Sequence, residues 1–208
     1  MAHFDLHEQE QLSNLKYFWQ KGGRYIIGVV VVAIVAYIAN VVWVSYKSNQ
    51  AADAALIYTK FSAMQNNPKE MLNMTHELQS KYPHTEYSAM ASLLMAKTVW
   101  TSGDLKTASG LLNWVIDNAK DKSLISTARL RLADVLIDQQ QFDDALKQMQ
   151  QPHDQAFDVL YYIKRGDLYV AKGNLNKARD AYREAQQKAG QDSGVAQEVQ
   201  IRLDVLGG

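Results

Sequence analysis

The chain has 208 residues, of which 47% are apolar, and 22 basic residues balance 22 acidic ones. This length allows one well-formed core with accessory segments. The even charge balance excludes a basic footprint for nucleic acid and an acidic tail. The sequence contains no cysteine, which excludes disulfides, thiolate nucleophiles and cysteine metal sites without fixing the redox compartment.

The N-terminal tail, residues 1–24, carries a short apolar pattern at helical spacing. Its apolar residues are Leu12, Leu15, Phe18 and Trp19. The pattern indicates a short amphipathic helix over residues 11–21, lying on the inner face of a membrane. The alternative is a polar tail whose last turn merges into the next helix. Gly22-Gly23 is expected to separate the two helices.

An uncharged segment follows between Arg24 and Lys47. Residues 25–46 comprise 22 residues without a charged side chain. As a helix they would span roughly 33 Å, enough to cross a hydrocarbon core of roughly 30 Å. Aromatic rings stand at both ends of the segment, as is typical of the headgroup boundary. The segment therefore predicts a single transmembrane helix.

Two other interpretations of residues 25–46 are weaker. A buried core helix of this length normally has a polar face, and this segment has none. A cleavable signal peptide is the more serious rival, because Ala52-Asp53-Ala54 resembles a small-residue cleavage site. Its apolar region would span only about 7 to 15 residues and would begin closer to the N-terminus. We therefore expect the anchor to be retained.

The charges that flank the anchor predict its orientation. Lys16, Lys21 and Arg24 precede the helix within ten residues, whereas only Lys47 follows it at that distance. Because basic residues favour the cytoplasmic side, the N-terminus is expected inside and residues 47–208 outside.

Residues 47–208 read as helices throughout, and an internal repeat predicts their fold. The decisive residues, at offsets 0, 3, 7, 12, 16 and 19, are Gly166, Tyr169, Gly173, Ala178, Tyr182 and Ala185. This is the spacing of a tetratricopeptide repeat, a pair of antiparallel helices. Gly166 and Ala178 would leave room for the bulk of the two tyrosines, and Gly173 would end the first helix at a positive φ.

Weaker copies of the repeat precede the strong one. One copy has Ala133, Leu136, Gln140, Ala145 and Met149, and an earlier copy has Ala96, Val99, Gly103, Ala108 and Leu112. The interval from Ala108 to Ala145 is 37 residues, so the linker at residues 118–122 is expected to hold a small insertion.

A further helix pair is expected upstream, over residues 51–65 and 68–81, with Asn67 capping its second helix. Residues 195–206 are expected to form a capping helix with Val195, Val199 and Leu203 inward. The predicted fold is all-α: one transmembrane helix, then a tetratricopeptide-like α-solenoid of about three to four helix pairs and a C-terminal capping helix.

Residues that could carry chemistry do not form a recognisable constellation. The histidines are His3, His7, His76, His84 and His153. His3 and His7 could share a helix face, but no third ligand follows at suitable spacing. No nucleophile elbow and no phosphate-binding glycine loop is present. Paired acids at Asp143-Asp144 and within residues 117–121 indicate a solvated face or a helix cap. We expect no enzyme, no cofactor and no metal.

The remaining mechanism is protein binding, because repeat arrays curve and the first helix of each pair lines the concave side. The predicted groove consists of Met90, Leu93, Lys97, Trp100, Leu130, Asp134, Ile137, Leu160, Ile163, Asp167 and Val170. We expect a mostly apolar surface for partner helices or unfolded segments, with Trp100 as an aromatic anchor. The alternative is that several of these residues are core, or are covered by the helices of residues 51–81.

The layout of the chain also resembles a known family. A short tail, one anchor, the segment Arg129-Leu130-Arg131-Leu132-Ala133 and a helix with Gly166-Asp167 are similar to the YfgM-type ancillary translocon subunits of Gram-negative bacteria. The similarity extends over nearly the full length. It implies an inner-membrane protein with a cytoplasmic tail (1–24), a transmembrane helix (25–46) and a periplasmic repeat domain (47–208).

The resemblance further implies association with the SecYEG channel and with PpiD, a membrane-anchored prolyl-isomerase-like chaperone, in handing over newly exported proteins. A structural adaptor for envelope assembly or division, with no role in export, would need the same anchor and repeats and is the alternative.

Overall fold

The computed structural model describes residues 6–189 and 193–207, with the side chains of 12–23, 25–189 and 194–207, and this part of the chain contains only helices and their connections. The helices are α1 (Leu6–Ala63), α2 (Pro68–Lys81), α3 (Glu86–Thr101), α4 (Leu105–Asn118), α5 (Lys122–Asp138), α6 (Phe142–Met149), α7 (Asp158–Ala171), α8 (Leu175–Ala189) and α9 (Ser193–Val205). A short 3₁₀ turn, Gln155–Phe157, precedes α7. The contacts divide the chain into two compact units that meet between Asn49 and Gln50.

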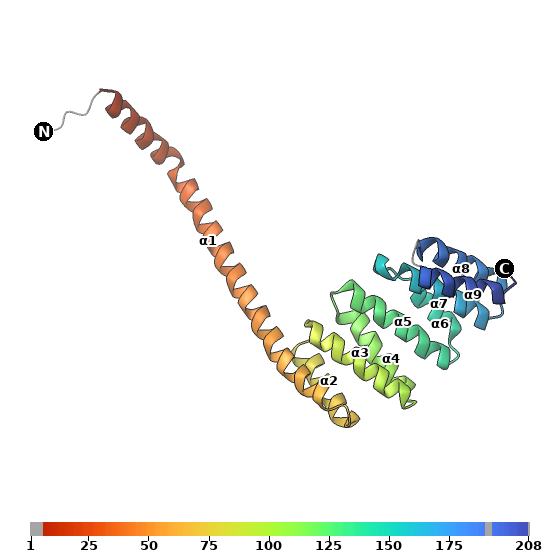
Figure 1. The fold of residues 1–208 in the computed structure, drawn as a ribbon. Helices are drawn as coiled ribbons and strands as arrows, with labels where there is room; N and C mark the ends of the chain where they lie inside the picture. The colour runs from red at the N-terminus through yellow and green to blue at the C-terminus, as the bar shows by residue number, and fades with distance from the viewer. Residues whose placement is uncertain (1–5, 190–192, 208) are drawn as a thin grey trace. The chain divides into compact units, whose positions relative to one another are not determined.

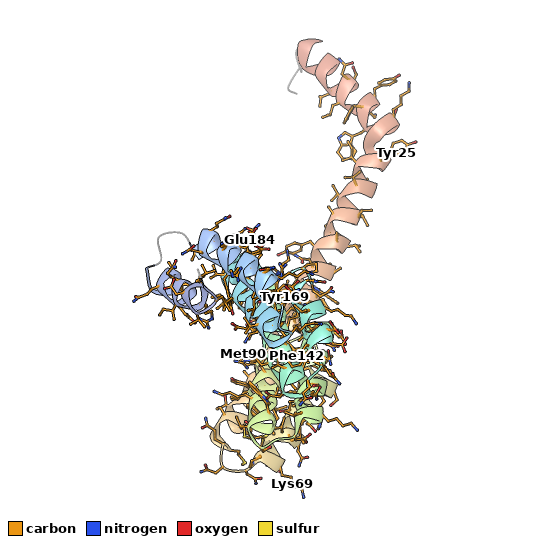
Figure 2. The ribbon with its side chains drawn as sticks, turned by 90° about the vertical axis from the view of Figure 1, so that its right-hand side faces the viewer. Tyr25, Lys69, Met90, Phe142, Tyr169 and Glu184 are labelled. Carbon is orange, nitrogen blue, oxygen red and sulfur yellow. The ribbon has the colours of Figure 1, made fainter. Side chains whose placement is uncertain are left out.

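The first unit consists of most of α1. Within the described residues, the segment Tyr25–Ala63 of this helix is the one stretch long and apolar enough to cross a membrane. Its apolar side chains project from the helix around Tyr25 and beyond (Figure 2) and are exposed, as Val29, Val42 and Trp43 illustrate. An apolar surface of this size is typical of a segment that lipid covers.

The glycine pair does not separate two helices, contrary to the sequence-based expectation, because α1 continues through Gly22 and Gly23. A glycine in a helix costs about 1 kcal/mol relative to alanine but does not forbid helical dihedrals. Here the missing side chain has a use, since a Cβ on Gly23 would lie 2.5 Å from Cε3 of Trp19. The indole ring covers the glycine. The helix expected at residues 51–65 is likewise not separate but forms the last turns of α1.

The second unit consists of helix pairs that follow one another along the chain, coloured from yellow to blue in Figure 1. Each helix contacts the next from α2 to α9, and α3, α5 and α7 also contact one another in order. The contacting pairs are α3 with α4, α5 with α6, and α7 with α8, followed by α9. Before them, the last turns of α1 share the core cluster with α2 through Phe61 and Met71. The all-α, tetratricopeptide-like prediction is confirmed.

The core runs through this array between the two helices of each pair. Its largest fully buried side chains are Phe61, Met71, Leu78, Met95, Leu112, Leu132, Met149, Tyr161 and Leu168. A second, smaller cluster joins α7, α8 and α9 around Ile163 and Tyr182, and Tyr169, labelled in Figure 2, packs against both clusters. Val199 and Leu203 of α9 are buried, as expected of a capping helix, and Val195 packs against them partly buried.

The small-to-large packing predicted for the last repeat is present. A Cβ on Gly166 would lie 2.2 Å from Cε1 of Tyr182, so only glycine admits the ring at this point of α7. Ala178 and Ala185 are fully buried on the facing side of α8. The close approach of the two helices therefore depends on residues without bulk.

Three turns of the array share one geometry, in which a residue at positive φ follows the first helix of the pair. The φ angles are 89° at Gly103, 60° at Gln140 and 73° at Gly173. At Gly103 the N–H donates to the Trp100 carbonyl and the next N–H donates to the Val99 carbonyl, both at 2.9 Å. The same two bonds recur at the other turns, so all three are Schellman motifs.

Side chains cap the N-termini of several helices by accepting hydrogen bonds from the first backbone N–H groups. Asn67 accepts from the Glu70 N–H at 3.3 Å, which confirms the predicted cap of α2. Asp121 caps α5 by accepting from the Ser123 and Leu124 N–H groups at 2.7 and 3.0 Å. Asp143 instead pairs with Lys172 at the end of α7, which holds the pKa of that carboxyl below its usual range. These acids are structural.

The middle turn is the weakest of the three, and replacing Gln140 with glycine is expected to stabilise the protein by about 0.5–1 kcal/mol. A side chain at positive φ costs about 1–2 kcal/mol, which the greater freedom of glycine in the unfolded chain partly offsets. Urea unfolding of the full chain measures the change. The reverse substitution, Gly173→Gln, is the matched control and should lose a similar amount, because open space surrounds its Cβ position. Equal stability of both variants would contradict the assignment.

Candidate functional site

The candidate site is the exposed side of the first helices of the last three pairs, α3, α5 and α7, which we call the first-helix face. The predicted groove residues are distributed unevenly on it. Met90, Lys97, Leu160 and Val170 are exposed, whereas Trp100, Leu130, Asp134, Ile137 and Asp167 are partly buried.

Two predicted groove residues, Leu93 and Ile163, do not lie on the accessible surface. They are only 6% and 7% exposed and belong to the hydrophobic clusters. The physical reason is that α3 contacts α2, α4 and α5, so only a narrow strip of the helix remains open. Leu130 and Ile137 pack against the same core from its edge. The alternative interpretation given above, that several of the predicted groove residues belong to the core, therefore holds for Leu93 and Ile163.

Polar links join α3 to α5 across this face. The indole N–H of Trp100 donates to Oδ2 of Asp138 at 2.6 Å, and Nη1 of Arg131 donates to the Leu93 carbonyl at 3.0 Å. This hydrogen bond fixes the orientation of the Trp100 ring. A side chain that is already ordered loses less entropy when a ligand binds.

A further ion pair joins α5 to α7, where Nζ of Lys164 lies 2.5 Å from Oδ1 of Asp134. Asp167 is also occupied, because it accepts from the Tyr182 hydroxyl at 2.7 Å and from Nε of Arg202 at 3.3 Å. Burial of the Tyr182 hydroxyl, together with the Asp167 carboxylate, raises its pKa well above the ordinary value. Asp134 and Asp167 thus neutralise cations of the array and are not free for a ligand.

The face is hollowed between α3 and α5 by a cavity of about 270 Å³. The lining residues are Ala96, Lys97, Trp100, Leu112, Arg131, Asp134 and Val135. Three of them, Lys97, Trp100 and Asp134, were predicted from the sequence. Arg131 was missed, although it lies in the segment of residues 129–133 that carries the family resemblance. A signal was available, since first-helix residues about one repeat apart become neighbours, and Leu93 and Arg131 are 38 positions apart.

The structure offers no metal site among the residues it describes, and His3 and His7 lie outside the described side chains. His153 has a structural role. Its ring stacks on Tyr161 with centroids 3.8 Å apart, and Nε2 lies 3.0 Å from Oδ1 of Asp158. The hydrogen bond from Lys188 holds the pKa of Asp158 below its usual range. This stack of partly buried His153 on buried Tyr161 orders the connection between α6 and α7.

Comparison with known proteins identifies the family. A model of a tetratricopeptide repeat-like domain matches residues 16–208. Over 204 residues the chain is 31% identical to the ancillary SecYEG translocon subunit of Neisseria gonorrhoeae (strain ATCC 700825 / FA 1090), covering 97% of this chain and 98% of the relative. The chain belongs to the family of ancillary SecYEG translocon subunits.

Other members of the family are less similar in sequence but match this chain over most of their length. The ancillary SecYEG translocon subunit of Haemophilus influenzae (strain ATCC 51907 / DSM 11121 / KW20 / Rd) is 27% identical over 190 residues, 90% of this chain and 93% of the relative. That of Escherichia coli (strain K12) is 24% identical over 200 residues, 96% of each chain. The family likeness thus includes the apolar helix as well as the repeats.

Proposed function

We propose that the chain is a non-enzymatic interaction module tethered to the inner membrane, which works beside the SecYEG channel and a PpiD-like chaperone in handing over exported proteins. The first-helix face is the proposed binding surface. The observation that supports this most directly is the cavity between α3 and α5, where the partly buried Trp100 ring is ordered by its hydrogen bond to Asp138 and lies beside an apolar floor. The relatives, which are ancillary SecYEG translocon subunits, support the translocon as the setting.

The proposal includes a topology with the N-terminus in the cytoplasm and residues 47–208 in the periplasm. The basic residues before the anchor support it. Retention of the anchor is supported by Ala54 and Phe61. They lie two turns apart on α1, and both side chains are fully buried in the core. Cleavage after Ala54 would cut the helix that supplies these core contacts.

Photocrosslinking of the full chain in its native membrane tests the proposal. A photoreactive side chain replaces Met90 or Leu160, which are 40% and 49% exposed and lie on the first-helix face. Met90 is two turns before Lys97 on α3, and Leu160 is one turn before Lys164 on α7. We expect crosslinks to channel subunits, to the chaperone or to polypeptides in transit.

The matched controls carry the same group at Asn113 of α4 and Lys147 of α6, on the second helices of their pairs. The proposal predicts at least several-fold stronger crosslinks from the first-helix positions. Equal yields from both sets, or crosslinks only to proteins of envelope assembly or division, would contradict it.

A further inference from the structure

The cavity between α3 and α5 has the size of a single side-chain pocket. Its volume of about 270 Å³ lies just below the roughly 300–1,000 Å³ of pockets that hold whole small molecules. The floor consists of Ala96, Leu112 and Val135, which are buried, and the Trp100 ring forms a wall. These groups favour a large apolar or aromatic side chain, since aromatic pairs gain beyond the area they bury.

The lining of this pocket carries more positive than negative charge, with Lys97 and Arg131 against Asp134. Asp134, the one acid in the lining, is neutralised by Lys164 at 2.5 Å. Arg131 spends one N–H on the Leu93 carbonyl, and a guanidinium has five N–H donors in all. Lys97 is exposed and forms no ion pair with any residue in the described part of the chain. Asp138, one turn beyond Asp134, is outside the lining and accepts the indole N–H.

We infer that this pocket takes one large apolar side chain of an extended polypeptide and that Lys97 and Arg131 bind an aspartate or glutamate side chain beside it. The inference rests on the proposed function and specifies which segments of exported polypeptides the first-helix face selects. Charge complementarity is the argument for this occupant, because two cationic groups stand over an apolar floor with no free acid in the lining. Charge-assisted hydrogen bonds to a carboxylate are stronger than neutral ones.

The test uses the full-length chain in detergent micelles and three fluorescent peptides, blocked at both ends so that no terminal carboxylate is present. Each contains a phenylalanine in a glycine–serine background, followed by aspartate, asparagine or lysine. Fluorescence anisotropy measures their affinities. The aspartate peptide should bind about tenfold more tightly than the asparagine peptide, the size expected for one good charge-assisted contact, and the lysine peptide should bind most weakly.

A charge reversal makes the test specific. Lys97→Glu should weaken the binding of the aspartate peptide, so that the lysine peptide binds more tightly than the aspartate peptide. Lys97 is exposed and pairs with no acid in the described part of the chain, so this substitution leaves the fold intact. Lys69→Glu, on α2 and labelled in Figure 2, makes the same charge change away from the pocket lining and should leave the order of the peptides unchanged.

The possible failures are distinguishable. If the three peptides bind wild type equally, or if Lys97→Glu leaves their order unchanged, the inference is overturned while the proposed function stands. If no peptide binds wild type but Met90 and Leu160 still crosslink to the translocon, the inference is again overturned. Absence of both peptide binding and crosslinks would overturn the proposed function itself.

Discussion

Replacing Phe61 with alanine is expected to destabilise the repeat domain by about 3–5 kcal/mol, the usual cost of removing a buried aromatic ring. Phe61 is fully buried at the end of α1. Its ring stacks on Tyr58 with centroids 5.6 Å apart, and Tyr58 in turn contacts Tyr87 of α3 at 5.6 Å. Loss of the ring leaves a cavity at the point where α1 joins the core.

Urea unfolding of the full chain in detergent, followed by tryptophan fluorescence, measures this effect. Trp100 and Trp114 report on the repeat domain, since both pack against its core. Leu56→Ala is the matched control. Leu56 lies on the same helix but is 65% exposed, so its truncation should change stability by less than about 0.5 kcal/mol. Similar losses in both variants would show that the end of α1 is not part of the core.

Gly166→Ala is expected to destabilise the protein by about 2–3 kcal/mol, in the upper part of the range for overpacking. The added Cβ would lie 2.2 Å from Cε1 and 2.5 Å from Cδ1 of Tyr182. The ring cannot easily yield, because it is buried and its hydroxyl donates to Asp167 at 2.7 Å. The clash therefore moves α7 away from α8 or breaks the link to Asp167.

Gly110 of α4 provides the control for Gly166, because a Cβ at that position meets nothing within 4 Å. Gly110→Ala should stabilise the protein by about 0.5–1 kcal/mol through the better helix propensity of alanine. Thermal unfolding compares the two variants. In a Tyr182→Leu background the cost of Gly166→Ala should fall, since the smaller side chain vacates the space. A Gly166→Ala variant as stable as wild type would refute the close-packing account.

The repeat fold was predictable because its signals are local. Gly103 and Gly173 mark two turns, and the register of the repeat places the third turn at Gln140, where composition alone gives no sign of positive φ. The continuity of α1 was not predictable in the same way. Gly22 and Gly23 have low helix propensity, but the contact of Trp19 with Gly23 adds a favourable term that composition does not express.

The candidate site was predictable to the level of helices but not of side chains. A helix that contacts three neighbours exposes a narrow strip, and the position of that strip depends on packing angles that sequence spacing does not fix. Leu93 and Ile163 therefore fell on the buried side. The partners of Asp134 and Trp100 also come from a neighbouring pair, so Lys164 and Asp138 become relevant only once the first helices are aligned.

The walls of the pocket belong to two different helix pairs, with Trp100 on α3 and Arg131 on α5, and few polar links bridge them. The width of the pocket is consequently a measure of how strongly the array bends between these pairs. A side chain that fits only one width stabilises one curvature, and by linkage any force that bends the array alters the affinity of the pocket. In mechanical terms, the affinity of the pocket for its side chain depends on how strongly the solenoid is bent between these two pairs.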